Sequence, residues 1–457
     1  MNDTIAAIST SLGVGAISII RVSGIDSLKI VNKIWKGKDL NKVATHTINY
    51  GYIVDNNKVI DEVLVSVMLA PKTFTTENIV EINSHGGVAT TNKILELLLL
   101  NGTRLAEPGE FTKRAFLNGR IDLLEADGIM NLISSKTERA RDLSINQLTG
   151  KVTNKIKTLR EELIKIISHI EVNIDYPEYE DIEQLTTESI KPFLEKFKEK
   201  LKGIIKKSQE GKIITNGINV GIIGRPNVGK SSLLNALLEE EKAIVTDIEG
   251  TTRDIVEGNI ILNGVVLNII DTAGIRQTND IVEKIGVQKS KEIINKSDLV
   301  ILILNNNEIL QEEDKKIFDL LKDKKHITVI NKSDLEQKID LNILTESYIK
   351  TSIKNGVGLE DLKKEIIKLF NLGQIESDDL TYLTDARSIS LLKKSLEYID
   401  ESIKSIDNNE PIEIVELGIK QSWETLGEII GETYKEELLD ELFSRFCVGK
   451  WNKWIMK

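Results

Sequence analysis

The stretch Gly224-Arg-Pro-Asn-Val-Gly-Lys-Ser231 has the form G-x-x-x-x-G-K-S. An apolar run, residues 218–223, precedes it, and residues 231–238 read as the start of a helix, so the sequence predicts strand, loop and helix in that order. In such a loop the glycines let consecutive backbone N–H groups point at phosphate oxygens, and the helix N-terminus adds partial positive charge. A chance glycine-rich turn is the alternative, but the flanking pattern favours a phosphate-binding loop. We expect Lys230 to reach the β- and γ-phosphates and Ser231 to offer a hydroxyl to Mg²⁺.

Later motifs indicate which nucleotide binds. Asp271-Thr-Ala-Gly274 follows an apolar run, where an Asp can hold Mg²⁺ through water and the Gly274 N–H can meet the γ-phosphate. Asn331-Lys-Ser-Asp334 has the form N-K-x-D, and the Asp334 carboxylate can accept two hydrogen bonds from guanine N1 and N2. Adenine offers no such pair of donors. Thr351-Ser352 fits the loop that touches the guanine carbonyl. Each motif is common alone, but their order after successive strands predicts GTP.

Composition and charge argue against several classes of protein. The chain has 457 residues, of which 40% are hydrophobic, and a net charge of −11. The charge argues against a broad nucleic-acid-binding surface, although a local basic patch is compatible with it. We find no signal peptide, no membrane-spanning run and no zinc-ligand spacing, and Cys447 is the only cysteine. We therefore expect a cytoplasmic protein without a membrane partner or an intrachain disulfide.

Hydrophobic periodicity divides the chain into four parts. Residues 1–117 have the pattern of a small α/β domain, and residues 118–212 that of amphipathic helices. Strands alternate with helices over 213–375, which predicts a mostly parallel sheet covered on both faces. Residues 376–457 are helical again but have no partner of their own. The predicted fold is a multidomain α/β plus all-α protein in which these last helices pack on the earlier ones, with the nucleotide domain inserted between them.

Within the first helical part, apolar residues recur at steps of three and four, which predicts one buried face per helix. The residues on these faces are Val152, Ile156, Leu159, Leu163, Ile166, Ile170 and Ile174 in one helix, and Ile190, Phe193, Phe197, Leu201 and Ile204 in the next. In the tail, the residues Leu391, Leu392, Leu396 and Ile399 form one stripe, and Leu438, Leu439, Leu442 and Phe446 form another.

Several polar residues in the first part stand beside apolar or turn residues. Composition alone favours ordinary salt bridges at strand ends for Arg21, Glu81 and Arg120. His85 stands just before a predicted helix and could cap it.

Taken together, these pieces resemble the bacterial tRNA-modification GTPase family MnmE, also called TrmE. The resemblance covers nearly the full length and rests on GRPNVGKSSLLNALL, on AIVTDIEGTTRD at 243–254, on DTAGIR, on NKSD, on EFTKRAFLNGRIDLLEAD at 110–127 and on FCVGK. The last two are not general GTPase features. The resemblance implies a folate-binding and dimerisation domain at 1–117, a helical domain split between 118–212 and 376–457, and an inserted G domain at 213–375.

The resemblance also implies a reaction and partners. The family acts as a homodimer with the flavoprotein MnmG, which carries FAD, in a heterotetramer or larger complex. Together they add an aminomethyl or carboxymethylaminomethyl group to C5 of the wobble uridine of certain tRNAs. A tetrahydrofolate derivative such as 5-formyltetrahydrofolate supplies the one-carbon unit. Arg21, Glu81, Arg120 and Lys450 match the family's folate-binding positions; a pterin offers donors to Glu81, and cations suit the glutamate tail.

Cys447 is a candidate reactive thiol, with a small packed hydrophobe as the alternative. Two features depart from the family pattern. Seven residues follow Lys450, where the family commonly ends. Thr75-Thr76-Glu77 replaces the usual Thr-Gly-Glu turn, and we expect only a local change in that loop.

Hydrolysis needs a group that orients water, because Ile275 stands where Ras-type GTPases have Gln. The resemblance points to Glu283, acting through a bridging water; a solvated helix charge is the alternative. The matched motifs hold no arginine finger, and the resemblance implies a K⁺ ion at Asn227, Thr246, Ile248 and Thr251, ordered when two G domains meet, with Thr252 joining Ser231 on Mg²⁺. The residues expected to contact GTP are Asn227, Val228, Gly229, Lys230, Ser231, Ser232, Thr246, Asp247, Ile248, Glu249, Gly250, Thr251, Thr252, Asp271, Thr272, Ala273, Gly274, Asn331, Lys332, Asp334 and Ser352.

A second class of function uses the same nucleotide motifs. A regulatory or ribosome-assembly GTPase without a modification role would also bind GTP in this way. The pattern of the first 117 residues and the FCVGK segment favour tRNA modification.

Overall fold

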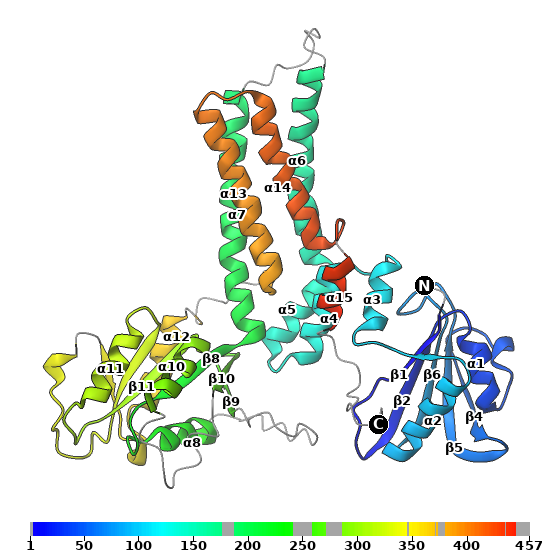
Figure 1. Cartoon of the computed structure of the whole chain (residues 1–457), viewed down its shortest axis with the longest axis horizontal. Helices are drawn as coiled ribbons and strands as arrows, with labels where there is room; N and C mark the ends of the chain where they lie inside the picture. The colour runs from blue at the N-terminus through cyan, green and yellow to red at the C-terminus, as the bar shows by residue number, and fades with distance from the viewer. Residues whose placement is uncertain are drawn as a thin grey trace. The chain divides into compact units, whose positions relative to one another are not determined.

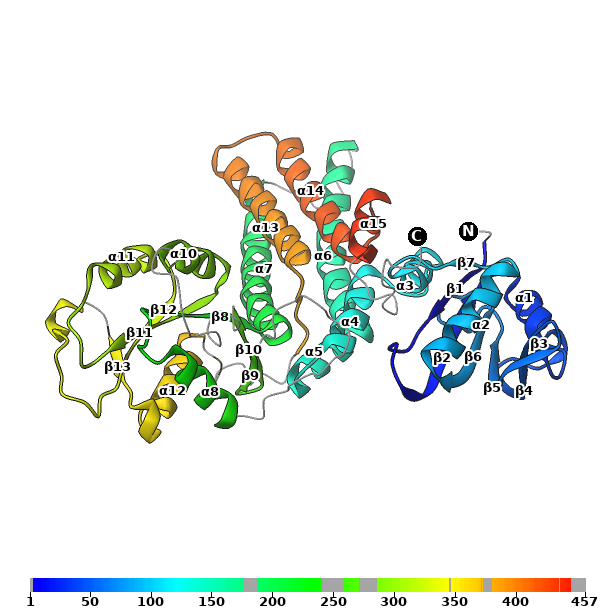
Figure 2. The same ribbon diagram turned by 60° about the horizontal axis from the view of Figure 1, so that its bottom comes forward.

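The computed structural model describes residues 3–175, 187–240, 258–270, 286–344, 347–370, 372, 380–434 and 436–444. Contacts divide the chain into two compact units. The first comprises residues 1–130, 156–160 and 423–457, and the second comprises residues 131–155 and 161–422. Figures 1 and 2 show the course of the chain in two views.

The first unit is built on a seven-stranded sheet with the order β3-β4-β5-β6-β2-β1-β7. All neighbours run antiparallel except β1 and β7, which are parallel. Helices α1 (Ser27–Ile34) and α2 (Val88–Leu100) pack their apolar residues on one face of this sheet. The strands are β1 (Ile5–Ile8), β2 (Gly15–Ser23), β3 (Trp35–Lys36), β4 (Thr47–Asp55), β5 (Lys58–Met68), β6 (Ile79–Gly86) and β7 (Arg104–Leu105).

Strand alternation decides which face each side chain of β2 and β6 occupies. Val22 and Val80 point into the core beneath the helices, so Arg21 and Glu81 lie on the opposite face. Strand β6 continues beyond Ile82 to Gly86. These last residues are mostly polar, yet they pair with β2 because every second one lies on the face away from the core.

A smaller core in the first unit joins segments that are far apart in sequence. Phe116 of α3 (Glu110–Leu117) and Leu123 of α4 (Leu123–Ser134) pack with Leu439 and Phe443 of α15 (Glu436–Ser444). Phe443, absent from the predicted stripe, is among the largest fully buried side chains. The predicted Phe446 lies outside the described residues.

In the second unit the C-terminal helices pack on the earlier ones, as the sequence predicted. Helix α13 runs beside α7 in both views (Figures 1 and 2), and ion pairs join Lys198 to Asp400 and Lys191 to Asp407. The helices are α5 (Glu138–Leu148), α6 (Lys151–Asp175), α7 (Thr187–Asn216), α13 (Ala386–Asp407) and α14 (Ile412–Ile430).

The buried faces of α6 and α7 differ slightly from the predicted stripes. Ile167 is buried where Ile166 was expected, and Leu194 and Ile205 are more buried than their neighbours Phe193 and Ile204. At each position two adjacent residues are apolar, and a period of 3.6 residues brings only one of them onto the contact face.

A second sheet, with the order β13-β12-β11-β8-β10-β9, lies in the second unit. It is parallel except at β9, which pairs antiparallel with β10. This arrangement confirms the mostly parallel sheet predicted for the nucleotide domain. The strands are β8 (Ile218–Ile223), β9 (Gly258–Leu262), β10 (Val265–Ile270), β11 (Leu299–Asn305), β12 (His326–Asn331) and β13 (Tyr348–Lys350).

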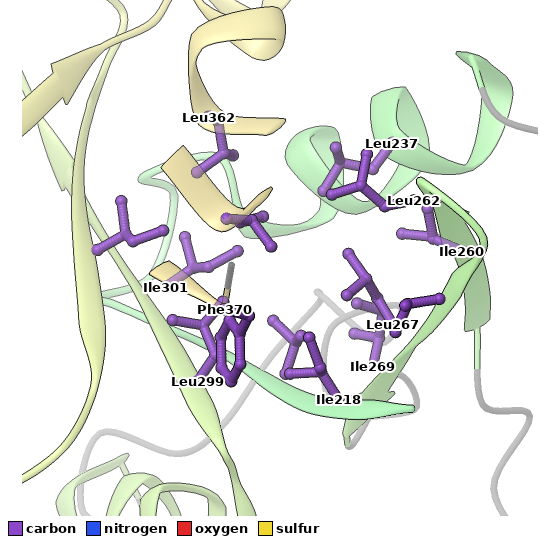
Figure 3. Packing of buried hydrophobic residues seen from close by; sticks show 14 of the residues in the cluster. Ile218, Leu237, Ile260, Leu262, Leu267, Ile269, Leu299, Ile301, Leu362 and Phe370 are labelled. Atoms are coloured by element: carbon purple, nitrogen blue, oxygen red, sulfur yellow. The ribbon is translucent and has the colours of Figure 1, made fainter. Parts of the chain in front are cut away.

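Helices cover both faces of this sheet, so β11 is buried along its whole length. Figure 3 shows one face, where Leu362 of α12 lies on the side of Ile301 of β11 and Leu237 of α8 lies beside Leu262 of β9. Helices α10 and α11 cover the other face. The helices are α8 (Lys230–Glu240), α10 (Gly286–Lys296), α11 (Glu312–Leu321) and α12 (Leu359–Leu369), with short 3₁₀ turns at Leu40–Lys42, Leu341–Ile343 and Ile353–Asn355.

Candidate functional site

The phosphate loop connects β8 to α8 in a tight space. Gly224 and Gly229 have φ angles of 149° and 105°, and Asn227 has a φ of 62°. A Cβ on Gly224 would lie 2.4 Å from the carbonyl oxygen of Ile303, and one on Gly229 would lie 2.2 Å from Nδ2 of Asn331. Both glycines are therefore required by close approach as well as by backbone conformation.

Lys230 opens α8 and turns back along the loop. Its Nζ donates to the carbonyl oxygens of Gly224 and Arg225, each at 2.7 Å. Burial lowers the pKa of this amino group below its usual range. Lys230 therefore stands at the centre of the loop, where phosphate oxygens can replace the two carbonyls as its partners.

Ser231 and Ser232 lie in the first turn of α8, beside the loop. A serine hydroxyl is a hard oxygen ligand of the kind that Mg²⁺ prefers, so Ser231 fits the expected metal. The other predicted Mg²⁺ contacts, Thr252 and Asp271, lie outside the described residues. Within the described residues, no three His, Cys, Asp or Glu side chains gather into a metal cluster.

Asn331 ties the phosphate loop to the guanine motif. It ends β12 and is buried, and its Nδ2 donates to the carbonyl oxygen of Val228 at 2.9 Å. Its Oδ1 accepts from Oγ1 of Thr351 at 3.3 Å and from the N–H of Ile353 at 3.2 Å. One side chain thus holds three loops together at the carboxyl ends of the strands, where ligands bind in sheets of this kind. Lys332, the next residue, has a φ of 64°.

Asp334 is exposed at the same edge of the sheet. Oγ of Ser352 donates to its Oδ1 at 2.6 Å, and this hydrogen bond holds the pKa of the carboxyl below its usual 3.8. Asp334 is therefore an ionised acceptor at neutral pH, suited to a pair of N–H donors. The described structure brings Lys230, Asn331, Asp334 and Ser352 to one end of the sheet.

A second cluster lies on the face of the first sheet that is opposite α1 and α2. Arg21 donates to Oε1 of Glu81 from Nε at 2.8 Å and from Nη2 at 2.7 Å, across paired positions of β2 and β6. The guanidinium of Arg21 lies 5.7 Å from the centre of the Phe74 ring, and that of Arg120 lies 4.9 Å from it. The structure therefore brings Arg21, Glu81 and Arg120 together around Phe74, a residue that the sequence did not single out.

A cavity of about 510 Å³ opens beside this ring. Its lining includes Lys72, Phe74, Asn118 and Arg120, and none of the described residues that line it is acidic. Arg120 also donates to the carbonyl oxygen of Phe74 at 3.1 Å. An aromatic face beside two cations suits an anionic aromatic ligand.

Hydrogen bonds to Glu77 hold the loop of residues 73–77, which carries Phe74. Glu77 accepts from Oγ of Ser23 at 2.7 Å and from Nη1 of Arg114 at 3.0 Å. Arg114 is almost fully buried and also donates to Asp3 and Glu110. These bonds hold the loop in one conformation, which includes a φ of 62° at Thr76.

His85 does not cap α2, so that alternative is wrong. The N-cap of α2 is Gly87, and no side chain caps the helix there. The backbone N–H of His85 donates to Asp61 at 2.8 Å, and its ring Nδ1 lies 2.7 Å from the same carboxylate. The strand β6 runs on to this residue, so its side chain is directed across the sheet to β5.

Several predicted site residues lie outside the described residues, and nothing can be said of their positions. They are Thr246, Asp247, Ile248, Glu249, Gly250, Thr251, Thr252, Asp271, Thr272, Ala273, Gly274, Ile275, Glu283, Cys447 and Lys450.

Comparisons with known proteins match both the N-terminal part of the chain and the part that contains the phosphate loop. The model of the GTP-binding protein TrmE N-terminus matches residues 4–120, and that of the MnmE helical domain matches residues 123–447. The tRNA modification GTPase MnmE of Bacillus cytotoxicus is 52% identical over 455 residues, which is 98% of this chain and 99% of that protein. The chain belongs to the MnmE family of tRNA modification GTPases. The MnmE protein of Bacillus licheniformis is similar, at 51% identity over 98% of this chain and 100% of its own length.

Among solved structures, the FeoB G-domain from Methanococcus jannaschii covers 34% of this chain and 98% of its own, with 26% identity and a TM-score of 0.25. A score this low says nothing about the fold, which the strand order establishes instead. Membership of the MnmE family shows that the chain is a GTPase. This activity agrees with the guanine-binding motif at residues 331–334. In the described part of this MnmE-family chain, no helix is long and apolar enough to cross a membrane.

Proposed function

We propose that this chain hydrolyses GTP while it serves, with a flavoprotein partner of the MnmG kind, in the modification of tRNA. The product is an aminomethyl or carboxymethylaminomethyl group on C5 of the wobble uridine of certain tRNAs. The observation that carries the proposal is the hydrogen bond from Asn331 to Val228, which joins a phosphate loop to a guanine motif in a chain that matches tRNA modification GTPases over nearly its full length.

The domain boundaries are part of the proposal. Residues 1–117 form the folate-binding and dimerisation domain, residues 118–212 and 376–457 the helical domain, and residues 213–375 the G domain. The seven-stranded sheet in the first part and the packing of α13 on α7 support this division. The protein acts as a homodimer in the cytoplasm, where tRNA and the flavoprotein partner are found.

The chain's own residues perform the binding half of the GTPase cycle. Lys230 exchanges its two carbonyl partners for β- and γ-phosphate oxygens, and Asp334 accepts from guanine. Ser231 with Thr252 would hold Mg²⁺, which would supply positive charge to the phosphates. Because Asn331 couples the two loops, binding of the base also fixes the loop that holds the phosphates.

Hydrolysis then depends on residues that orient water and neutralise charge. Glu283 orients the attacking water through a second water, since Ile275 has no hydrogen-bonding group. K⁺ supplies the charge that an arginine finger supplies elsewhere. Asn227 fits it, because this residue of the phosphate loop is exposed, with a φ of 62°, and its amide oxygen is a suitable ligand.

The cluster around Phe74 suits a tetrahydrofolate. The Glu81 carboxylate can accept from pterin N–H groups, the ring of Phe74 offers a stacking face, and Arg120 with Lys72 suits the carboxylates of the glutamate tail. The folate derivative supplies a one-carbon unit when bound, and these residues orient it. Lys450 and Cys447 complete the site in this proposal.

The deciding experiment is mass spectrometry of wobble uridines from cells that lack this protein. We expect the C5 modification to disappear and to return with the parent chain, but not with Lys230→Ala or Glu81→Gln. A ribosome-assembly GTPase would leave the modification intact in the deletion, and its growth defect would not depend on Glu81. That result would overturn the proposal.

A further inference from the structure

Arg225 is the one cation in the phosphate loop besides Lys230, and two carboxylates bind its side chain. Its Nε donates to both carboxylate oxygens of Asp314, at 3.2 and 3.0 Å, and its Nη2 donates to Oε2 of Glu308 at 2.6 Å. Only 17% of the Arg225 side chain is exposed. The guanidinium therefore forms charge-assisted bonds to two carboxylates rather than projecting freely from the loop.

Both carboxylates are themselves held in place. Asp314 is 2% exposed and belongs to the capping box of α11, where its Oδ2 accepts from the N–H of Gln311 at 2.9 Å. Glu308 accepts from Nδ2 of Asn305, the last residue of β11, at 2.5 Å. Arg225 is thus fastened to the end of the neighbouring strand and to the start of the helix that follows it.

The backbone of Arg225 has a second role in the same loop. Its carbonyl oxygen is one of the two that Lys230 binds. The bonds to the Arg225 side chain therefore restrain the residue whose carbonyl oxygen Lys230 binds.

We propose that Arg225 is a positioning residue for GTP binding: its clamp to Glu308 and Asp314 holds the phosphate loop, and through it Lys230, in the conformation that accepts the phosphates. Arg225 does not itself neutralise charge on the reacting phosphate, because its donors are directed to carboxylates. The inference rests on GTP binding at this loop, and it assigns nothing to the tRNA reaction.

The test uses the full chain with Mg²⁺ and compares Arg225→Ala, Arg225→Lys, Glu308→Gln and the double variant Arg225→Ala/Glu308→Gln. The dissociation constants of GDP and of a non-hydrolysable GTP analogue are measured beside single-turnover hydrolysis at saturating GTP. Lys315→Ala, which removes an exposed ion pair with Glu312 on the same helix, is the matched control. Binding of GDP by the parent chain tests the loop assignment separately from the clamp.

We expect Arg225→Ala to weaken GDP and the analogue by the same factor, at least tenfold, while hydrolysis at saturation falls less than fivefold. Arg225→Lys should recover part of the affinity, and Glu308→Gln should weaken both nucleotides severalfold. The double variant should bind no worse than Arg225→Ala, because the two residues act as one unit. Glu308 is the partner chosen because it is partly exposed and leaves the helix cap intact.

Three results would overturn the inference. The first is a fall in saturated hydrolysis of a hundredfold or more with unchanged affinity, which would make Arg225 a cation acting on the reacting phosphate. The second is strict additivity of Arg225→Ala and Glu308→Gln. The third is an effect of Lys315→Ala as large as that of Glu308→Gln, which would show a general loss of helix stability.

Discussion

At the scale of single residues, specificity for the base depends on one carboxylate and its neighbour. Ser352 donates to Asp334, which keeps the carboxyl ionised and directs its oxygens. The motif N-K-x-D identifies Asp334 in the sequence, but its hydrogen bond to a residue eighteen positions later becomes visible only in the fold.

Asp334→Asn should weaken GTP binding and improve binding of xanthosine triphosphate, because the amide presents a donor where guanine needs an acceptor and xanthine offers a carbonyl at C2. Fluorescence titration with both nucleotides measures the change, and we expect the GTP affinity to fall by about 10²-fold, within the range of about 1–3 kcal/mol lost when a hydrogen-bonding group is left without its partner. Asp323→Asn, at an exposed site in the same domain, is the control. An unchanged preference for GTP would show that Asp334 does not read the base.

His85 should titrate above the usual 6.5, because the hydrogen bond to Asp61 and the charge of that carboxylate raise its pKa. A group whose pKa is raised on folding stabilises the fold fully below its unfolded pKa and loses that effect as the pH rises through the folded value. The His85–Asp61 pair should therefore stabilise the N-terminal sheet at pH 6 and contribute less at pH 8.5.

NMR titration of the four histidines checks this prediction. Asp61→Asn should return the His85 pKa toward 6.5, whereas Glu62→Gln should move it much less, since Glu62 contributes least. A His85 pKa at or below 6.5 in the parent chain would contradict the hydrogen bond seen here.

The sequence predicts residues well where a local pattern defines their role. The glycines of the phosphate loop and Asp334 lie at marked positions in local patterns, and Arg21 and Glu81 form the salt bridge that composition alone favours. Arg225 and Phe74 were missed because their partners, Asp314 for one and Arg120 for the other, are remote in sequence. In the same way, the spacing of apolar residues cannot show whether Ile166 or Ile167 is buried, because this depends on which of the two contacts the neighbouring helix.

At the scale of elements, the loop of residues 73–77 shows how a departure from the family pattern is accommodated. The family resemblance leads us to expect Gly at position 76, and the φ of 62° at Thr76 lies in the region that a β-branched residue rarely adopts. Ser23 and Arg114 hold the loop through Glu77, so the anchoring bonds keep the strained residue in place.

Thr76→Gly should therefore stabilise this loop, by about 1 kcal/mol, because the left-handed conformation costs a non-glycine residue about 1–2 kcal/mol and the extra freedom of unfolded glycine offsets part of the gain. Hydrogen exchange of residues 70–80 and urea denaturation of the full chain measure it. Lys72→Gly, at a neighbouring position without positive φ, should be neutral or destabilising. Faster exchange in Thr76→Gly would show that the threonine side chain stabilises the loop.

From the lining of the cavity beside Phe74 we predict how the affinity for folate depends on the length of its glutamate tail. Arg120→Ala should weaken 5-formyltetrahydrofolate binding by about tenfold or more, because it removes a charge-assisted contact and the cation over the ring. Lys72→Ala should weaken a triglutamate form more than the monoglutamate, since Lys72 lies on the same cavity and can reach further carboxylates.

Isothermal titration with both tail lengths separates the two roles. Lys29→Ala, which removes an exposed cation of α1, is the control for loss of general positive charge. Equal losses for the two tail lengths in Lys72→Ala would mean that the tail leaves the cavity elsewhere.

At the scale of the whole molecule, the hydrolytic step is incomplete within the described residues. Lys230 and the start of α8 supply positive charge to the phosphates, but Arg225 is bound by two carboxylates and cannot act as an arginine finger in its own loop. Within the described residues, Lys230 is thus the side-chain cation at the loop that is left for the phosphates, and we propose that an ion from the solvent supplies the further positive charge.

We expect K⁺ to be that cation, held at Asn227 when two G domains meet. GTP turnover should rise about tenfold or more when NaCl is replaced by KCl at equal ionic strength, because the smaller Na⁺ fits a site built for K⁺ poorly. The rate per chain in KCl should also rise with protein concentration, as a face-to-face dimer requires, while the rate in NaCl stays flat. Steady-state phosphate release at several protein concentrations measures both effects, and Lys230→Ala sets the background. Asn227→Ala should remove the potassium effect, because the amide oxygen is the proposed ligand of the ion, and its rate in NaCl reports any separate loss of GTP binding. Equal rates in the two salts at every concentration would exclude the ion site.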